Sequence, residues 1–225
     1  MQHITDRWSR TIRRLALTMV LAPWITVAPP ALAQQPVSVA LATPAGQLAC
    51  TPALTGGGKP VRWEVVAAPG APAERAVAEI TRDRTAERYP LCIHEAIAAA
   101  NVDVTLSFKP VDGKDDRAGG IAVRLRDADT YYVARANALE DNVRLYHVLK
   151  GVRRQFAGKD GVKVASGQWH TLRLRVVGEA FEVFFNGQPL FTARDTRITA
   201  AGKVAVWTKA DSLTQFGAMT VTVLP

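Results

Sequence analysis

Short runs of β-branched and aromatic residues, separated by glycine-containing turns, recur along most of this 225-residue chain. Runs with this composition and spacing predict β-strands. The clearest runs cover residues 62–67, 76–81, 102–108, 121–126, 131–137, 143–149, 169–177, 181–185, 203–208 and 219–224. About ten strands joined by short connections leave no room for the crossover helices that a parallel sheet requires. We therefore expect an all-β fold in which two antiparallel sheets pack as a sandwich.

Five dipeptides mark positions where the chain is expected to reverse: Asp112-Gly113, Gly119-Gly120, Asp160-Gly161, Gly178-Glu179 and Asn186-Gly187. Glycine and asparagine tolerate the positive φ angles of tight turns. Asn186-Gly187 lies between two apolar runs and is the strongest hairpin signal. The only helix-like window covers residues 93–100 and is too short to be stable alone, so we expect at most a short surface helix there.

The first 33 residues have the order of a secretory signal peptide. Four arginines precede an apolar run over residues 15–27, and Ala31-Leu32-Ala33 supplies small residues for cleavage. Prolines interrupt the run, which is shorter than the roughly 20 apolar residues of a spanning helix. We therefore predict cleavage after Ala33 and a periplasmic or secreted protein with no membrane span after cleavage. Cleavage leaves 24 basic and 19 acidic residues, a formal charge of +5 in place of +8.

The rest of the chain divides into two parts. Residues 34–60 are rich in Ala, Pro, Gly and Thr, which favours a linker or a loosely attached N-terminal segment. Residues 61–225 are expected to form the ordered β-sandwich domain. Basic residues are scattered along it without the clustering of a nucleic-acid-binding groove, so no nucleic acid partner is expected.

Cys50 and Cys92 are the only two cysteines. An exported protein can keep a disulfide, so we expect one bridge between them. Closing that loop would stabilise the fold by about 4 kcal/mol at most. Two unpaired thiols are the alternative.

Four segments carry a family resemblance: GGIAVRLRDADTYYVARAN (119–137), GQWHTLRL (167–174), FFNGQPLF (184–191) and GKVAVWTK (202–209). Together they resemble the laminin-G-like and concanavalin A-like jelly rolls of exported bacterial proteins. The greatest similarity is to the group related to 3-keto-disaccharide hydrolases, often labelled family 16 glycoside hydrolase-like. The resemblance covers residues 61–224. It implies two curved antiparallel sheets whose concave face commonly holds sugar.

The sequence lacks the carboxylate spacing that family 16 glycoside hydrolases use for catalysis. Retaining glycosidases need two carboxylates roughly 5 Å apart. Family 16 enzymes supply these carboxylates from a Glu-x-Asp-x-x-Glu motif, which does not occur in this sequence. The histidines are scattered without ligand spacing. Calcium is a possible ligand at a loop edge, and the oxygens would come from Asp112, Asp115, Asp116, Asp127 and Asp129, which lack the spacing of a calcium loop. No other cofactor is expected.

Strand alternation places a set of polar and aromatic side chains on common faces. A sheet face with arginines, amides and aromatic rings suits a sugar, because hydroxyl groups accept planar hydrogen bonds and CH faces stack on rings. Alternatively, these residues are the solvated side of a half-buried sheet. The predicted ligand-binding residues are Arg124, Arg135, Asn137, Arg144, Tyr146, Trp207 and Lys209.

Three hypotheses follow. The first is an exported, monomeric carbohydrate-binding module that holds an oligosaccharide or polysaccharide on its concave face. The second is an enzyme resembling 3-keto-disaccharide hydrolases, in which an acidic residue abstracts a proton and a basic residue stabilises the oxyanion. The third is a structural domain that binds a protein partner and no sugar. The absence of a carboxylate pair favours the first.

Overall fold

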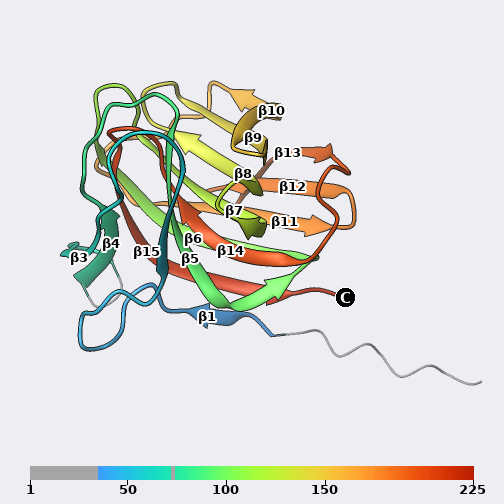
Figure 1. The fold of residues 1–225 in the computed structure, drawn as a ribbon, viewed down its shortest axis with the longest axis horizontal. Helices are drawn as coiled ribbons and strands as arrows, with labels where there is room; N and C mark the ends of the chain where they lie inside the picture. Colours follow the sequence, from blue (N-terminus) through green and yellow to red (C-terminus); the bar gives the residue numbers. More distant parts are fainter. Residues whose placement is uncertain (1–34, 72–73) are drawn as a thin grey trace, which may run out of the picture. The chain divides into compact units, whose positions relative to one another are not determined.

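The computed structural model describes residues 35–71 and 74–225. Within this part of the chain, fifteen β-strands form two antiparallel sheets, and there is no α-helix (Figure 1). The predicted all-β sandwich is therefore confirmed. The predicted signal peptide, residues 1–33, lies outside the described residues. No helix of the described residues is long and apolar enough to cross a membrane.

One sheet has eight strands. Seven follow one another in the order β13 (Gln188–Arg194), β12 (Ala180–Phe185), β11 (His170–Val177), β6 (Val102–Asp112), β15 (Leu213–Val223), β4 (Arg75–Glu79) and β3 (Trp63–Ala67). The eighth, β1 (Val37–Val39), pairs with the end of β15.

The other sheet has seven strands. Their order is β10 (Val152–Asp160), β9 (Asn142–Leu149), β8 (Thr130–Asn137), β7 (Ala118–Asp127), β14 (Gly202–Trp207), β5 (Arg88–Ala99) and β2 (Thr51–Gly56). β10 and β2 are therefore the edge strands.

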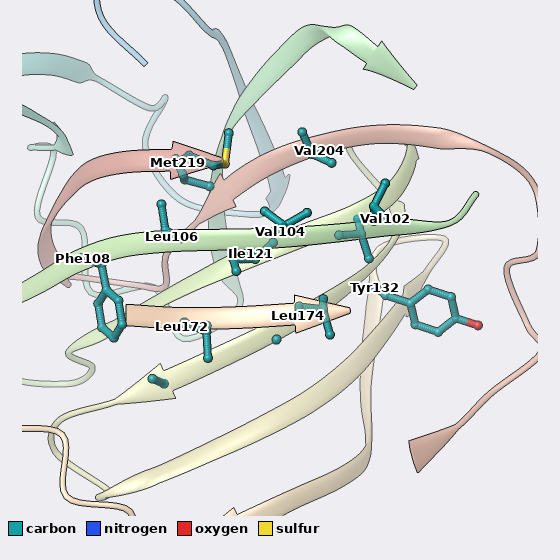
Figure 2. Packing of buried hydrophobic residues seen from close by; sticks show 14 of the residues in the cluster. Val102, Val104, Leu106, Phe108, Ile121, Tyr132, Leu172, Leu174, Val204 and Met219 are labelled. Atoms are coloured by element: carbon teal, nitrogen blue, oxygen red, sulfur yellow. The ribbon is translucent and has the colours of Figure 1, made fainter. Parts of the chain in front are cut away.

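The core fills the space between the two sheets (Figure 2). Alternate residues of β6 are buried along nearly its whole length, as the period-2 pattern requires. These side chains meet inward-facing residues of the seven-stranded sheet. Figure 2 labels members of the cluster from both sheets: Val102, Val104, Leu106, Phe108, Ile121, Tyr132, Leu172, Leu174, Val204 and Met219.

The expected boundary at residue 61 is corrected by the structure. The segment 34–60 is not a linker, because it supplies β1 to one sheet and β2 to the other. Cys50, directly before β2, forms a disulfide with Cys92 of β5, with 5.3 Å between the two Cα atoms. The predicted bridge is thus present, and it fastens the N-terminal segment to the fold.

The helix-like window 93–100 is also corrected. Its first seven residues belong to β5, which pairs with β14 on one side and β2 on the other. Hydrogen bonding to two neighbouring strands outweighs the helical propensity of an alanine-rich run.

Of two dipeptides predicted to be turns, one is a turn and the other lies within a strand. Asn186-Gly187 joins β12 to β13 with φ angles of 49° and 77°, which confirms the predicted hairpin. Gly119-Gly120 lies inside β7 and is not a turn. A Cβ atom on Gly120 would lie 2.5 Å from the carbonyl oxygen of Ala134, so this strand position needs glycine for a close backbone approach.

Candidate functional site

The seven-stranded sheet has an outer face, which points away from the eight-stranded sheet. Alternate residues of its strands belong to separate clusters: Tyr132 and Val206 face the core between the sheets, while Tyr131 and Trp207 face outward. Six of the seven predicted ligand-binding residues lie on this outer face or at its rim: Arg135, Asn137, Arg144, Tyr146, Trp207 and Lys209. Strand register makes Arg135 of β8 the direct neighbour of Arg144 on β9.

The outer face curls over on itself. Thr55 is on edge strand β2, and three strands separate it from β8 in the sheet. Its hydroxyl group nevertheless lies 2.9 Å from the hydroxyl group of Tyr131 on β8 and also donates to the carbonyl oxygen of Ala128. Tyr89 of β5 stacks on Trp207, with 5.6 Å between ring centroids. The sheet therefore encloses a second, smaller core on its outer side.

Trp207 belongs to this second core. It has no exposed surface, and its indole Nε1 donates to the Tyr131 hydroxyl at 3.2 Å. Burial also raises the pKa of Tyr131 well above its usual value, so its hydroxyl stays protonated. The position of Trp207 on this face follows the prediction, but its ring is a packing group and is not presented to solvent.

Arg153, on edge strand β10, covers the aromatic cluster. Its guanidinium carbon lies 4.3 Å from the ring centroid of Tyr146, 4.7 Å from that of Tyr89 and 5.7 Å from that of Trp207. Such distances allow attraction between the cation and the faces of the rings. Arg153 was not among the predicted site residues, because the polar run of β10 did not read as a strand. Its adjacency to Arg154 was the only sequence signal.

Arg135 is the most buried cation of the outer face, with 3% of its surface exposed. Its Nη2 donates to the Tyr146 hydroxyl at 2.8 Å and to Glu140 Oε2 at 3.0 Å. Burial acts to lower the pKa of Arg135, but Tyr146, Asp116 and Glu140 outweigh it and raise that pKa. Arg135 therefore carries a permanent charge inside the sheet.

Several polar atoms around Arg135 have no hydrogen-bond partner within the described part of the chain. They are Nε and Nη1 of Arg135, Nη1 of Arg153 and Oδ1 of Asn142. Asn142 uses its other amide atom, Nδ2, to donate to Glu140 Oε2 at 2.9 Å. Unpaired donors and an unpaired acceptor thus lie on three neighbouring strands, β8, β9 and β10.

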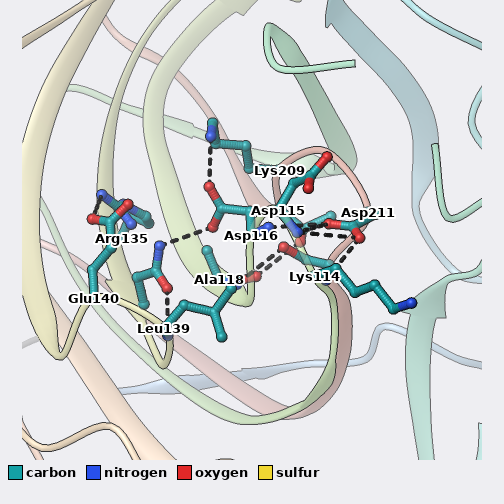
Figure 3. A network of polar contacts seen from close by, with 12 residues as sticks. Lys114, Asp115, Asp116, Ala118, Arg135, Leu139, Glu140, Lys209 and Asp211 are labelled. Carbon is teal, nitrogen blue, oxygen red and sulfur yellow. Dashed lines mark hydrogen bonds and ion pairs between the residues drawn. The ribbon is translucent and has the colours of Figure 1, made fainter. Parts of the chain in front are cut away.

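Asn137 and Lys209 hold a loop at the rim of the outer face. The Asn137 amide donates to Asp116 Oδ1 at 2.9 Å. The Lys209 ammonium lies 2.6 Å from Asp116 Oδ2, a contact that Figure 3 shows. The loop before Asp116 is fixed in turn by Asp211, whose carboxylate accepts backbone N–H groups of residues 114–116. Both predicted residues therefore have structural partners.

Arg144 is the most accessible of the predicted arginines on this face. Its side chain is 26% exposed. It donates to Gln155 and to Asp160 on β10, each at 2.8 Å. These partners are themselves exposed, so Arg144 can exchange them for a ligand at low cost.

Arg124 does not lie with the other predicted residues. It is 1% exposed, and its three nitrogen atoms donate to the carbonyl oxygens of Ala100, Ile198 and Gly178. Regular alternation along β7 would place Arg124 on the outer face. A bulge after Val123 interrupts that alternation, and the side chain reaches these three loops instead. We therefore leave Arg124 out of the candidate site.

The aspartates considered as calcium ligands are divided among separate contacts. Asp112 pairs with Arg82, Asp115 with Arg84, and Asp116 with Lys209. Asp127 accepts the backbone N–H of Asp129. Within residues 35–71 and 74–225, no group of three or more His, Cys, Asp or Glu side chains is arranged to hold a metal ion.

A separate cavity of about 620 Å³ lies at the eight-stranded sheet. Its walls come from residues 38–44, 75–77 and 216–218, where β1 and β4 follow each other along β15. None of the predicted ligand-binding residues lines it.

A family model described as "Galactocerebrosidase, C-terminal lectin domain" matches residues 117–224, just under half of the chain. No curated protein sequence matches significantly. Among solved structures, the carbohydrate-binding module CBM66 from Bacillus subtilis is 17% identical, with a TM-score of 0.58 over 71% of this chain and 94% of that one. The exoplasmic/lumenal domain of VIP36, in its Ca2+/Man-bound form, is 10% identical, with a TM-score of 0.52 over 74% and 84%. The chain therefore shares the two-sheet jelly-roll fold of these structures.

Proposed function

We propose that this protein is an exported carbohydrate-binding module whose glycan binds on the outer face of the seven-stranded sheet, at strands β8, β9 and β10. The observation that carries the proposal is the group of unpaired polar atoms beside aromatic rings on those strands. A sugar hydroxyl both donates and accepts, so it complements the Arg135 N–H groups and the Asn142 amide oxygen at once. Leaving such buried groups without partners is unfavourable, and a ligand relieves that cost.

The similar structures support this choice. One of them is a carbohydrate-binding module, and another is a lumenal domain in a Ca2+/Man-bound form. A fold serves many functions, so the site residues must carry the argument for this chain. Two features of the chain support export. The predicted signal peptide and the Cys50–Cys92 disulfide both suit a periplasmic or secreted protein.

Binding is favoured over the enzymatic alternative by the state of the acidic residue at the site. Glu140 is partly buried, which acts to raise its pKa, but Asn142 and Arg135 outweigh burial and lower the pKa. A general base works best with a pKa near the operating pH. Glu140 is therefore suited to holding Arg135 in place and is a weak proton acceptor.

A glycan array followed by calorimetric titration with the full chain tests this proposal. We expect at least one oligosaccharide to bind, and Arg144→Ala to weaken that binding about tenfold, as for the loss of a charged hydrogen bond. Arg175→Ala is the matched control, because Arg175 is similarly exposed, pairs with Glu182 and lies on the eight-stranded sheet. Equal losses in both variants, or no binding to any glycan, would contradict the proposal.

A further inference from the structure

Two guanidinium groups approach one aromatic ring from the two strands that flank it. The guanidinium carbon of Arg135, on β8, lies 5.6 Å from the ring centroid of Tyr146, and that of Arg153, on β10, lies 4.3 Å from it. Tyr146 is on β9, between them. Two positive charges are therefore held close together against a nearly buried ring.

The charges of this region do not cancel. Glu140 pairs with Arg135, Asp160 with Arg144, and Asp116 with Lys209. Arg153 forms no ion pair with any acidic side chain of the described residues. Ring faces compensate a cation only in part, so one positive charge at the site is without a counter-charge.

Most of the unpaired atoms at the site are hydrogen-bond donors. Three of the four are nitrogen donors of Arg135 and Arg153, and only the Asn142 oxygen is an acceptor. Three free donors and a surplus positive charge fit an anion better than a neutral hydroxyl group. A carboxylate suits them in shape as well, because its two oxygens match the planar fork of a guanidinium group.

We propose that the recognised sugar is acidic, and that the carboxylate of a uronic acid binds between Arg135 and Arg153 beside the ring of Tyr146. This inference rests on the proposed function and names its ligand class. Arg153 is half-buried and lies on an edge strand, so its side chain can turn outward to admit the ligand without breaking strand pairing. The sugar ring then packs against the aromatic cluster in the position that the Arg153 side chain leaves.

The test compares two oligosaccharides that differ only at the acidic group. One is an oligouronate, and the other is the same oligomer with its carboxyl groups reduced to primary alcohols. We expect the full chain to bind the oligouronate at least tenfold more tightly. Raising the salt concentration from about 50 to about 300 mM should weaken only the binding of the oligouronate.

Variants locate the effect. Arg153→Gln should remove about tenfold of the affinity for the oligouronate and a smaller part of the affinity for the reduced oligomer, so the preference for the acidic sugar should fall. Arg154→Gln is the matched control, because it changes the same charge on the next residue of β10, whose side chain points to the other side of the sheet. Equal effects of the two variants would overturn the assignment to Arg153.

The remaining outcomes separate this inference from the proposed function. Equal affinity for the oligouronate and its reduced form overturns the acidic ligand and keeps carbohydrate binding. Tighter binding of a sulfated, carboxyl-reduced oligomer overturns the carboxylate and keeps an anion. Binding of no oligosaccharide by the folded protein overturns both proposals.

Discussion

Tyr146 has two roles on the outer face, as a ring between two cations and as the acceptor of a hydrogen bond from Arg135. Tyr146→Phe keeps the ring and removes the hydroxyl group. We expect it to weaken glycan binding about tenfold and to lower the free energy of unfolding by about 1 kcal/mol. Calorimetric titration and urea unfolding measure the two effects.

Tyr132→Phe is the control for that substitution. The Tyr132 hydroxyl faces the inner core and donates to Asp195 at 2.6 Å. Its loss should lower stability and leave the affinity for glycan unchanged. If both variants reduce affinity equally, the Tyr146 hydroxyl has no specific role in binding.

His147 makes stability depend on pH. Burial and the nearby positive charge of Arg197 lower its pKa from 6.5, and Asp195 opposes them only in part. The folded state thus favours neutral imidazole, and the unfolded chain takes up the proton first as the pH falls. The free energy of unfolding should therefore decrease between about pH 7.5 and pH 5.5.

Urea unfolding at the two pH values checks this. His147→Gln should make the decrease smaller; the remainder comes in part from His94, whose pKa burial also lowers. An unchanged decrease in His147→Gln would show that His147 is not responsible.

At the scale of single residues, the sequence indicated which side chains share a face but not how accessible they are. Alternation placed Arg135, Arg144 and Tyr146 together, because register on neighbouring strands follows from the period of two. It did not show that Trp207 is enclosed. That burial depends on the curl of the whole sheet, which brings Arg153 of the distant strand β10 over the ring.

Among the elements, β2 and β5 are joined both by strand pairing and by the disulfide between Cys50 and Cys92. Replacing both cysteines with serine should lower the free energy of unfolding by about 2 to 4 kcal/mol. Comparing denaturant unfolding of the variant with that of the oxidised wild-type protein measures the loss. Equal stability would mean that strand pairing alone holds β2 in place.

Arg124 connects three loops that lie between strands of both sheets. Arg124→Met keeps a long side chain beside Phe181 but removes the guanidinium group over its ring and leaves three carbonyl oxygens without a donor. We expect a loss of about 2 to 4 kcal/mol in the free energy of unfolding. Affinity per folded molecule should stay the same, because the site lies elsewhere, and a titration at low temperature checks this. A selective loss of affinity would return Arg124 to the site.

The elements that the sequence did not reveal share a physical cause. β10 is an exposed edge strand of mostly polar residues in which only Phe156 and Ala157 pack against the core, so it lacks the alternation of half-buried strands. β1 has only three residues, and β5 contains an alanine-rich run that is helical by propensity. Their strand character comes from pairing with distant segments, which a local pattern does not contain.

For the whole molecule, the fold was predictable and the ligand was not. Ten strand runs and the Asn186-Gly187 hairpin were enough to indicate an antiparallel sandwich, since they leave few other topologies. The ligand depends on which polar atoms remain unpaired after folding. Arg153, the residue on which the ligand class depends, becomes visible only when β10 is placed beside β9.

An NMR titration of the full chain with the oligouronate tests the central claim most directly, because it reports where a ligand binds independently of any substitution. We predict that the largest shift changes fall on β8, β9 and β10, including the side-chain Nε–H signals of Arg135 and Arg153. Shift changes confined to the cavity walls at residues 38–44, 75–77 and 216–218 would contradict the account.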